Sequence, residues 1–301
     1  MYPIYNDKSF MSLMRSYTTI LFESLNKELW LREIASARAN YKNNIYKKYI
    51  ILEINSDLKS EEFEPIHFVT LACLIQFFDK NNHQVAINSG NDSIRNMLFS
   101  DLRIQEYWSG GKNHVDSTSN NIFNLWRIVE SEKDLYAKNV EKYFKNNFFK
   151  GKDLSIISLS MIEVYYNVFD HAEASGNAFS LIKYSEHNGM LYIAVCDFGK
   201  GIAKSVRDFT PDIANDKDAL LKSIEVDFTV GSKIHNKGRG LDNILSCSSV
   251  VRIFCNNALL LKTDTGIKTF DVDFHFSGTL IYLEINLLLT EDEEILDEFD
   301  L

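Results

Sequence analysis

The feature that most constrains the fold is a change in hydrophobic pattern about 120 residues into the chain of 301. Before this point, apolar runs of strand length alternate with longer runs of helix length. Beyond Leu154, one helix is followed by several strand-like runs separated by short turns. Alternating strands and helices favour a small α/β layer, whereas strands that follow one another directly favour an antiparallel sheet. The pattern therefore predicts two units of different architecture.

The first unit is predicted over residues 1–120, as a helical lead-in followed by a small α/β domain. Residues up to about Asn44 have helical spacing of apolar side chains, and "YIILEIN" is typical of a buried strand. A helix follows from Pro65, a residue that suits a first helical turn. A second strand, "QVAIN", precedes a second helix opened by a capping Asn or Asp. The polar, glycine-containing segment 109–121 is interpreted as a linker.

The second unit is predicted over residues 121–290, before an acidic tail at 291–301. A helix over 131–149 leads into another from Leu154 to Ala174. Two strands joined by a hairpin turn, "AFSLIKYS" and "MLYIAVCDFG", and three late strands, "VVRIFCN", "KTFDVDFHF" and "GTLIYLEINL", predict a two-layer α+β domain with a mixed, mostly antiparallel sheet. The helix side chains expected to pack on this sheet are Ile156, Leu159, Ile162, Tyr166 and Phe169.

Composition and charge exclude several classes of protein. The longest apolar run, "FVTLACLIQFF", is too short to cross a bilayer, so no membrane association is expected. Four cysteines without a CxxC pair suggest neither a zinc site nor a disulfide framework, which favours a reducing cytoplasm. The net charge of −10 falls to −3 once the tail, with seven carboxylates and no base, is set aside. Because no basic stripe is present, nucleic-acid binding is not expected.

A row of polar residues on the helix "EVYYNVFDHA" (163–172) is the first candidate binding segment. Glu163 and Asn167 lie four residues apart, and Asp170 or His171 continues the row at the rim of the apolar face. A carboxylate and a carboxamide held at the edge of a core can address one ligand. A partly exposed helix with ordinary polar residues would show the same pattern.

Two glycine-rich segments are the next candidates. In "CDFGKGI", Asp197 ends an apolar strand, and Gly199 and Gly201 allow close approach of the backbone. In "GSKIHNKGRGLDNI", Gly238 and Gly240 directly precede a helix, a location that favours phosphate, with basic residues close by. A tight turn and an ordinary loop before a helix remain the alternatives. A threonine, Thr279, opens the last long strand and would by itself be an ordinary β-former.

The order of these segments is more specific than any one of them. E-x-x-x-N on a helix, D-x-G-x-G after a strand, G-x-G-L before a helix and G-T on a late strand resemble the GHKL family of ATPases. That family, which has the Bergerat ATP-binding fold, includes gyrase B, the large heat-shock chaperone and sensor histidine kinases. The resemblance covers roughly residues 154–289.

This resemblance implies ATP and Mg²⁺ as cofactors and a role for each matched residue. Glu163 would be the catalytic base for the attacking water, and Asn167 would be a ligand of Mg²⁺. Asp197 would bind the adenine amino group, with support from Thr279. The remaining nucleotide contacts implied are Asp170, His171, Gly199, Gly201, Ile202, Lys237, Gly238, Arg239, Gly240 and Leu241. A flexible lid is expected over about 203–232.

The first unit is similar, more loosely, to STAS-like domains over Tyr49–Trp108. In phosphorylated members a Ser or Thr stands at the start of the helix that here begins with Pro65, Ile66 and His67. The resemblance therefore implies a protein-binding or dimerising module without phosphorylation at that point.

Three functions stay open. The first is ATP hydrolysis that drives lid closure and a switch read by a protein partner or in a homodimer. The second is a serine/threonine kinase of the anti-sigma-factor type, in which Glu163 would deprotonate a substrate hydroxyl. The third is a non-catalytic, ATP-gated interaction module. A histidine kinase is not expected, because His67, His83 and His114 lack the acid or Asn that follows a phosphoacceptor.

Overall fold

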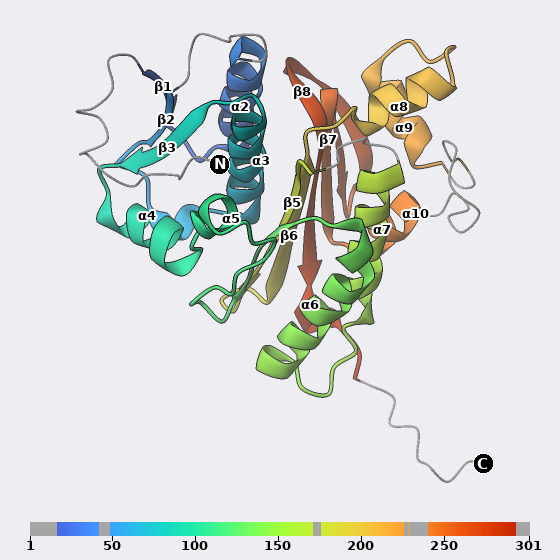
Figure 1. Cartoon of the computed structure of the whole chain (residues 1–301). Helices are drawn as coiled ribbons and strands as arrows, with labels where there is room; N and C mark the ends of the chain where they lie inside the picture. The colour runs from blue at the N-terminus through green and yellow to red at the C-terminus, as the bar shows by residue number, and fades with distance from the viewer. Residues whose placement is uncertain (1–16, 42–48, 171–175, 226–227, 229–239, 293–301) are drawn as a thin grey trace.

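The computed structural model describes residues 17–41, 49–170, 176–225, 228 and 240–292. It holds a three-stranded parallel sheet and a five-stranded antiparallel sheet, with helices between them and on the far side of the larger sheet (Figure 1). The change from an α/β to an antiparallel pattern along the sequence is thus confirmed. The predicted boundary at 120/121 falls directly before the first strand of the larger sheet.

The smaller sheet has the order β1-β2-β3, with every neighbouring pair parallel. Its strands are β1 (Thr18–Phe22), β2 (Tyr49–Ile54) and β3 (Gln84–Ser89), connected by the helices α2 (Lys27–Tyr41) and α3 (Pro65–Lys80). The prediction of helix throughout the lead-in is wrong at β1. Its residues "TTILF" are β-branched or apolar, and they pair along their whole length with β2.

The helix expected after β3 is broken into three short pieces. These are α4 (Asp92–Asn96), the π-helical turn η2 (Met97–Asp101) and α5 (Glu106–Ser109). The expected cap is confirmed, because the Asn91 side chain accepts from the backbone N–H groups of Ser93 and Ile94. Arg103 has a φ of 51°, which is incompatible with a continuous right-handed helix.

The larger sheet has the order β4-β5-β6-β8-β7, and all its neighbouring strands are antiparallel, so the expected mixed character is wrong for the described strands. The strands are β4 (Ile122–Arg127), β5 (Ala178–Ser185), β6 (Met190–Asp197), β7 (Val250–Thr263) and β8 (Gly266–Asn286). Strand β4 lies in a region where none was predicted. The second and third of the three predicted late strands form one continuous strand, β8. It pairs with β7 in a hairpin whose register shifts near Asn256.

Helices α6 (Lys133–Phe148), α7 (Ser155–Asp170) and α10 (Gly240–Cys247) pack together with one face of the larger sheet in a single core. The predicted packing face of α7 is right only in part. Ile156, Ile162 and Phe169 are partly buried against this core, whereas Leu159 is 58% exposed. The fully buried apolar residues of the helix are Ile157, Met161, Val164, Tyr165 and Val168. The true face is rotated by about one residue from the predicted one, because α6 and α10 also cover α7 and bury side chains that the sheet does not reach.

Helix α3 is buried on nearly all sides between the two sheets. Its residues from Pro65 to Phe78 are all buried. Because both sides of the helix are covered, its whole surface has to be mostly apolar. One continuous core contains the smaller sheet, α2, α3 and the other face of the larger sheet, including Phe179, Cys196 and Tyr282. Four layers therefore follow one another, namely parallel sheet, α2 with α3, antiparallel sheet, and α6 with α7 and α10 (Figure 1).

Candidate functional site

A small cavity lies between α7, the end of β6, β8 and the start of helix α8 (Ile202–Phe209). The residues that line it are Val164, Asn167, Val168, Val195, Asp197, Ile202, Thr279 and Ile281. Four of them are residues singled out from the sequence, and they come from segments separated by up to about a hundred positions. The free volume is about 10 Å³, close to the minimum for one water molecule. The cavity therefore gathers polar groups around a narrow, mostly apolar slot.

The carboxylate of Asp197 is the buried polar group of this cavity. The residue is only 2% exposed. Its Oδ1 accepts a hydrogen bond of 2.8 Å from the backbone N–H of Gly199, and the backbone of Thr279, its partner across the β6–β8 ladder, also donates to it. Burial raises the pKa of Asp197 to about 7, against the opposing effects of these donors and of Arg38. Near neutral pH this carboxyl is therefore present in both protonation states, and its ionised form can accept a hydrogen bond from a ligand.

Thr279 joins the end of the sheet to the next helix. Its Oγ1 accepts from the backbone N–H of Ile202 at 3.2 Å, and the Sγ of Cys255 accepts from the N–H of Ala203 at 3.2 Å. Both N–H groups belong to the first turn of α8 and have no intrahelical partner. The start of α8 is thus tied to β7 and β8 beside Asp197.

Two glycines allow these segments to approach one another. Gly201 has a φ of 86°, and an added Cβ would lie 2.8 Å from both the Cys255 Sγ and the Gly278 carbonyl oxygen. Gly278 has a φ of 110°, and its Cβ would lie 2.1 Å from the carbonyl oxygen of Asp197. Both positions therefore need glycine for conformation and for space.

We expect Gly278→Ala to lower the free energy of unfolding more than Gly266→Ala does. Both glycines lie in β8, with φ values of 110° and 113°, so the conformational cost is similar, roughly 1–3 kcal/mol. Only at Gly278 does the new Cβ clash, since none of the described atoms lies within 4 Å at Gly266. Overpacking adds about 1–3 kcal/mol. Urea unfolding measures the difference, and equal losses in the two variants would contradict the close approach.

Glu163 and Asn167 lie one turn apart on α7. The Asn167 Nδ2 donates to the Glu163 carbonyl oxygen at 2.9 Å. Because only the amide nitrogen can donate to a carbonyl, the Oδ1 of Asn167 is the atom left to act as a ligand. Glu163 is half-buried, does not line the cavity, and has its pKa raised by burial. A raised carboxyl pKa brings this group closer to the range in which it can take up a proton.

Several predicted residues are placed only in part. His171, Lys237, Gly238 and Arg239 lie outside the described residues, and only the backbone of Asp170 is described, at the end of α7. Gly240 begins α10, and Leu241 is buried in the core that α10 shares with α7. The interval expected to form a lid contains, in its described part, α8 and the helix α9 (Asp216–Ser223).

The histidines before α7 have structural surroundings. His67 is buried; its Nδ1 accepts from the Glu64 N–H, its Nε2 lies 3.1 Å from the Leu25 carbonyl oxygen, and burial lowers its pKa to about 4. His83 is also buried, and His114 lies against the Leu125 carbonyl oxygen. The side chain of His114 is 28% exposed, and its Nε2 lies 3.6 Å from the carboxylate of Asp116.

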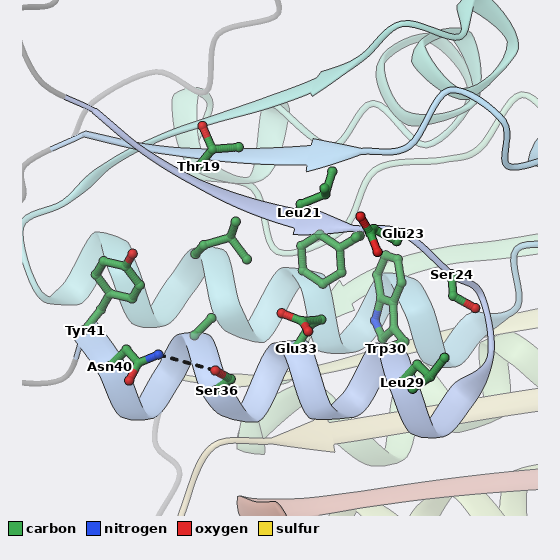
Figure 2. A pocket seen from close by; sticks show the side chains of 13 residues that line it. Thr19, Leu21, Glu23, Ser24, Leu29, Trp30, Glu33, Ser36, Asn40 and Tyr41 are labelled. Carbon is green, nitrogen blue, oxygen red and sulfur yellow. Dashed lines mark hydrogen bonds between the residues drawn. The ribbon is translucent and has the colours of Figure 1, made fainter.

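A larger hollow of about 450 Å³ lies in the first unit, between β1 and α2. Figure 2 shows Leu21 and Glu23 on the strand side and Trp30 and Glu33 on the helix side. Among the described residues, its lining includes the carboxylates of Glu23 and Glu33 and no basic side chain or glycine. The polar residues singled out from the sequence meet at the smaller cavity instead, which is therefore the candidate site.

The cavity is also lined by apolar residues that the sequence analysis did not single out, because that analysis relied on polar motifs. Four apolar residues in regular elements form its walls, namely Val164, Val168, Val195 and Ile281. Their sequence pattern is the same as that of ordinary core residues.

No protein-family model matches the chain, and no curated protein matches it. Within the described segments, no group of three or more His, Cys, Asp or Glu side chains could hold a metal ion. Among the same residues, no helix is long and apolar enough to cross a membrane.

Proposed function

We propose that the chain is an ATPase of the GHKL type that binds Mg-ATP at the cavity between α7 and β6, with a STAS-like unit on the opposite face of the sheet. The observation that carries this proposal is the meeting of Asn167, Asp197, Ile202 and Thr279 at one cavity. Three separate motifs of the sequence supply these residues, and an unrelated structural role would not require them to converge.

The buried carboxylate of Asp197 suits the exocyclic amino group of adenine. The amino group donates, the carboxylate accepts, and the apolar walls formed by Val164, Val168 and Ile281 suit the faces of a purine. Because the free volume is only about 10 Å³, the base would reach in with its amino edge and the slot would widen around it. Binding energy would then be linked to movement of α7 against the sheet.

The residues of α7 fit a magnesium-bound triphosphate. Mg²⁺ takes one or two protein oxygens and completes its shell with water and phosphate, and the Asn167 Oδ1 is such a donor. When bound, the ion would neutralise charge on the phosphates. Glu163, one turn away and half-buried, would accept the proton of the attacking water. In a protein kinase, the same carboxylate would accept the proton of a substrate hydroxyl.

Calorimetric titration with ATP tests the proposal. We expect binding that requires both Mg²⁺ and the amino group, and therefore weaker binding in EDTA and weaker binding of inosine triphosphate, which carries an oxygen in place of that group. Free phosphate as product supports hydrolysis, phosphate transferred to protein supports the kinase, and binding without turnover supports a gated module. Folded protein that takes up neither ATP nor ADP would refute all three.

A further inference from the structure

We propose that Arg38 of α2 is a positioning residue through which the first unit sets the geometry of the nucleotide site. The identity of the ligand rests on the proposed function, whereas the positioning itself concerns the free protein. Arg38 belongs to the smaller, parallel-sheet unit, yet its guanidinium lies between two chain segments of the larger sheet.

The contacts of Arg38 are with backbone. One terminal nitrogen donates to the carbonyl oxygen of Ser277, and the other donates to the carbonyl oxygen of Phe198 at 2.9 Å. Phe198 directly follows Asp197, and Ser277 precedes Gly278 and Thr279. The planar guanidinium, with two donors at a fixed spacing, therefore bridges the two segments that carry the purine-facing residues.

Aromatic rings hold the guanidinium in place. It lies 4.3 Å from the ring centre of Phe198 and 5.6 Å from that of Phe77, which belongs to α3. Cation–π contacts of this kind are stronger where water is excluded, and Arg38 is partly buried. The side chain is consequently fixed by α2, by α3 and by Phe198, which directly follows β6.

The bridged segments leave little freedom for independent movement. Asp197 and Thr279 face each other across the β6–β8 ladder, and Gly278 is so close to the Asp197 carbonyl that no side chain fits between them. A shift of α2 that moves the guanidinium would therefore displace both segments together. Such a shift would alter the hydrogen bonds that Asp197 and Thr279 accept from Gly199 and Ile202.

Helix α2 is also in contact with solvent on another side. Glu33, Ser36 and Asn40 are exposed and line the hollow beside β1 (Figure 2). The helix thus lies between an open surface of the first unit and the backbone of the nucleotide site. This placement makes α2 a direct connection between the two.

The test compares Arg38→Ala and Arg38→Lys with Arg32→Ala. Arg32 is a matched control, because it lies on the same helix and also contacts β8, through an exposed ion pair with Asp273. Hydrogen exchange of the amides of Gly199 and Ile202 is measured in the free protein, and the affinity for Mg-ATP is measured by calorimetry. Urea unfolding establishes that each variant is folded.

We expect Arg38→Ala to speed exchange at both amides and to weaken Mg-ATP binding about tenfold, as expected for loss of a charged hydrogen-bonding group. Arg38→Lys, which keeps the charge without the planar fork, should lie between wild type and alanine, and Arg32→Ala should match wild type. If Arg38→Ala does not fold, the exchange of the Arg38→Lys protein decides.

Unchanged exchange and unchanged affinity in a folded Arg38 variant would overturn the proposal, as would equal effects of Arg32→Ala. Failure of the proposed function is distinguishable from this result. A wild-type protein that binds no nucleotide would refute the ATPase assignment, while the exchange rates of the free protein would still support or overturn the role of Arg38.

Discussion

Replacing Asp197 by alanine is expected to weaken ATP binding strongly, with a rise in Kd of about 10- to 150-fold. The variant loses the buried carboxylate that we propose accepts from the adenine amino group, and a hydrogen bond with a charged partner contributes about 1.5–3 kcal/mol. Because the surrounding walls are apolar, water would solvate the unpaired amino group only poorly. Calorimetry on wild type and variant, with circular dichroism as a test of folding, measures the effect.

Asp197→Asn is the matched control, because it keeps an acceptor oxygen and removes the titration. The pKa of Asp197 is about 7, so most molecules carry the ionised carboxylate at pH 8 and few do at pH 6. Wild-type affinity for adenosine, which has no phosphate of its own to titrate, should therefore weaken as the pH falls from 8 to 6. The Asn variant should show no such dependence. Strong ATP binding by Asp197→Ala would place the base elsewhere.

The second large effect is expected for Glu163→Gln, which should keep Mg-ATP binding and lower turnover by about 10²–10⁴-fold, the usual contribution of a general base. The amide preserves size and hydrogen bonding but cannot take up the proton. Release of phosphate under single-turnover conditions, together with Kd from calorimetry, separates chemistry from binding.

Glu141→Gln serves as its control. Glu141 lies on α6 and accepts from Ser158 of α7, so its change perturbs the same helix layer without touching the cavity. Its turnover should be close to that of wild type. Hydrolysis retained in Glu163→Gln would exclude Glu163 as the base, and equal loss in both variants would indicate damage to the helix layer instead.

The sequence predicted helices and strands best where a local pattern of residues is typical of only one kind of secondary structure. Helix α3 begins at Pro65, as expected from the preference of proline for a first turn, and β5 and β6 form the expected hairpin. Strand β1 was missed because Leu21 and Leu25 also fit helical spacing, and its pairing partner lies about thirty residues away in β2. A five-residue run does not by itself indicate whether such a partner exists.

The position of α7 shows the same limit at the level of side chains. Its helical period was clear, but the choice of buried face required knowledge of α6 and α10, which cover it from other directions. Periodicity identifies one apolar stripe when one neighbour is present. Where three neighbours meet, most of the helix surface is apolar, and the stripe no longer indicates the sheet.

The amino-acid sequence by itself determined the two architectures, the order of their helices and strands in most places, and the candidate motifs around Asn167, Asp197 and Thr279. Each motif lies within a short segment, so the spacing and the chemistry of its residues can be recognised from the sequence alone. Only the tertiary structure decided that these motifs share one cavity and that Arg38 bridges Phe198 and Ser277, partners 160 and 239 residues away. Contacts over such distances depend on how whole layers pack, because the burial of α3 between two sheets brings α2 to the segments that hold Asp197 and Thr279.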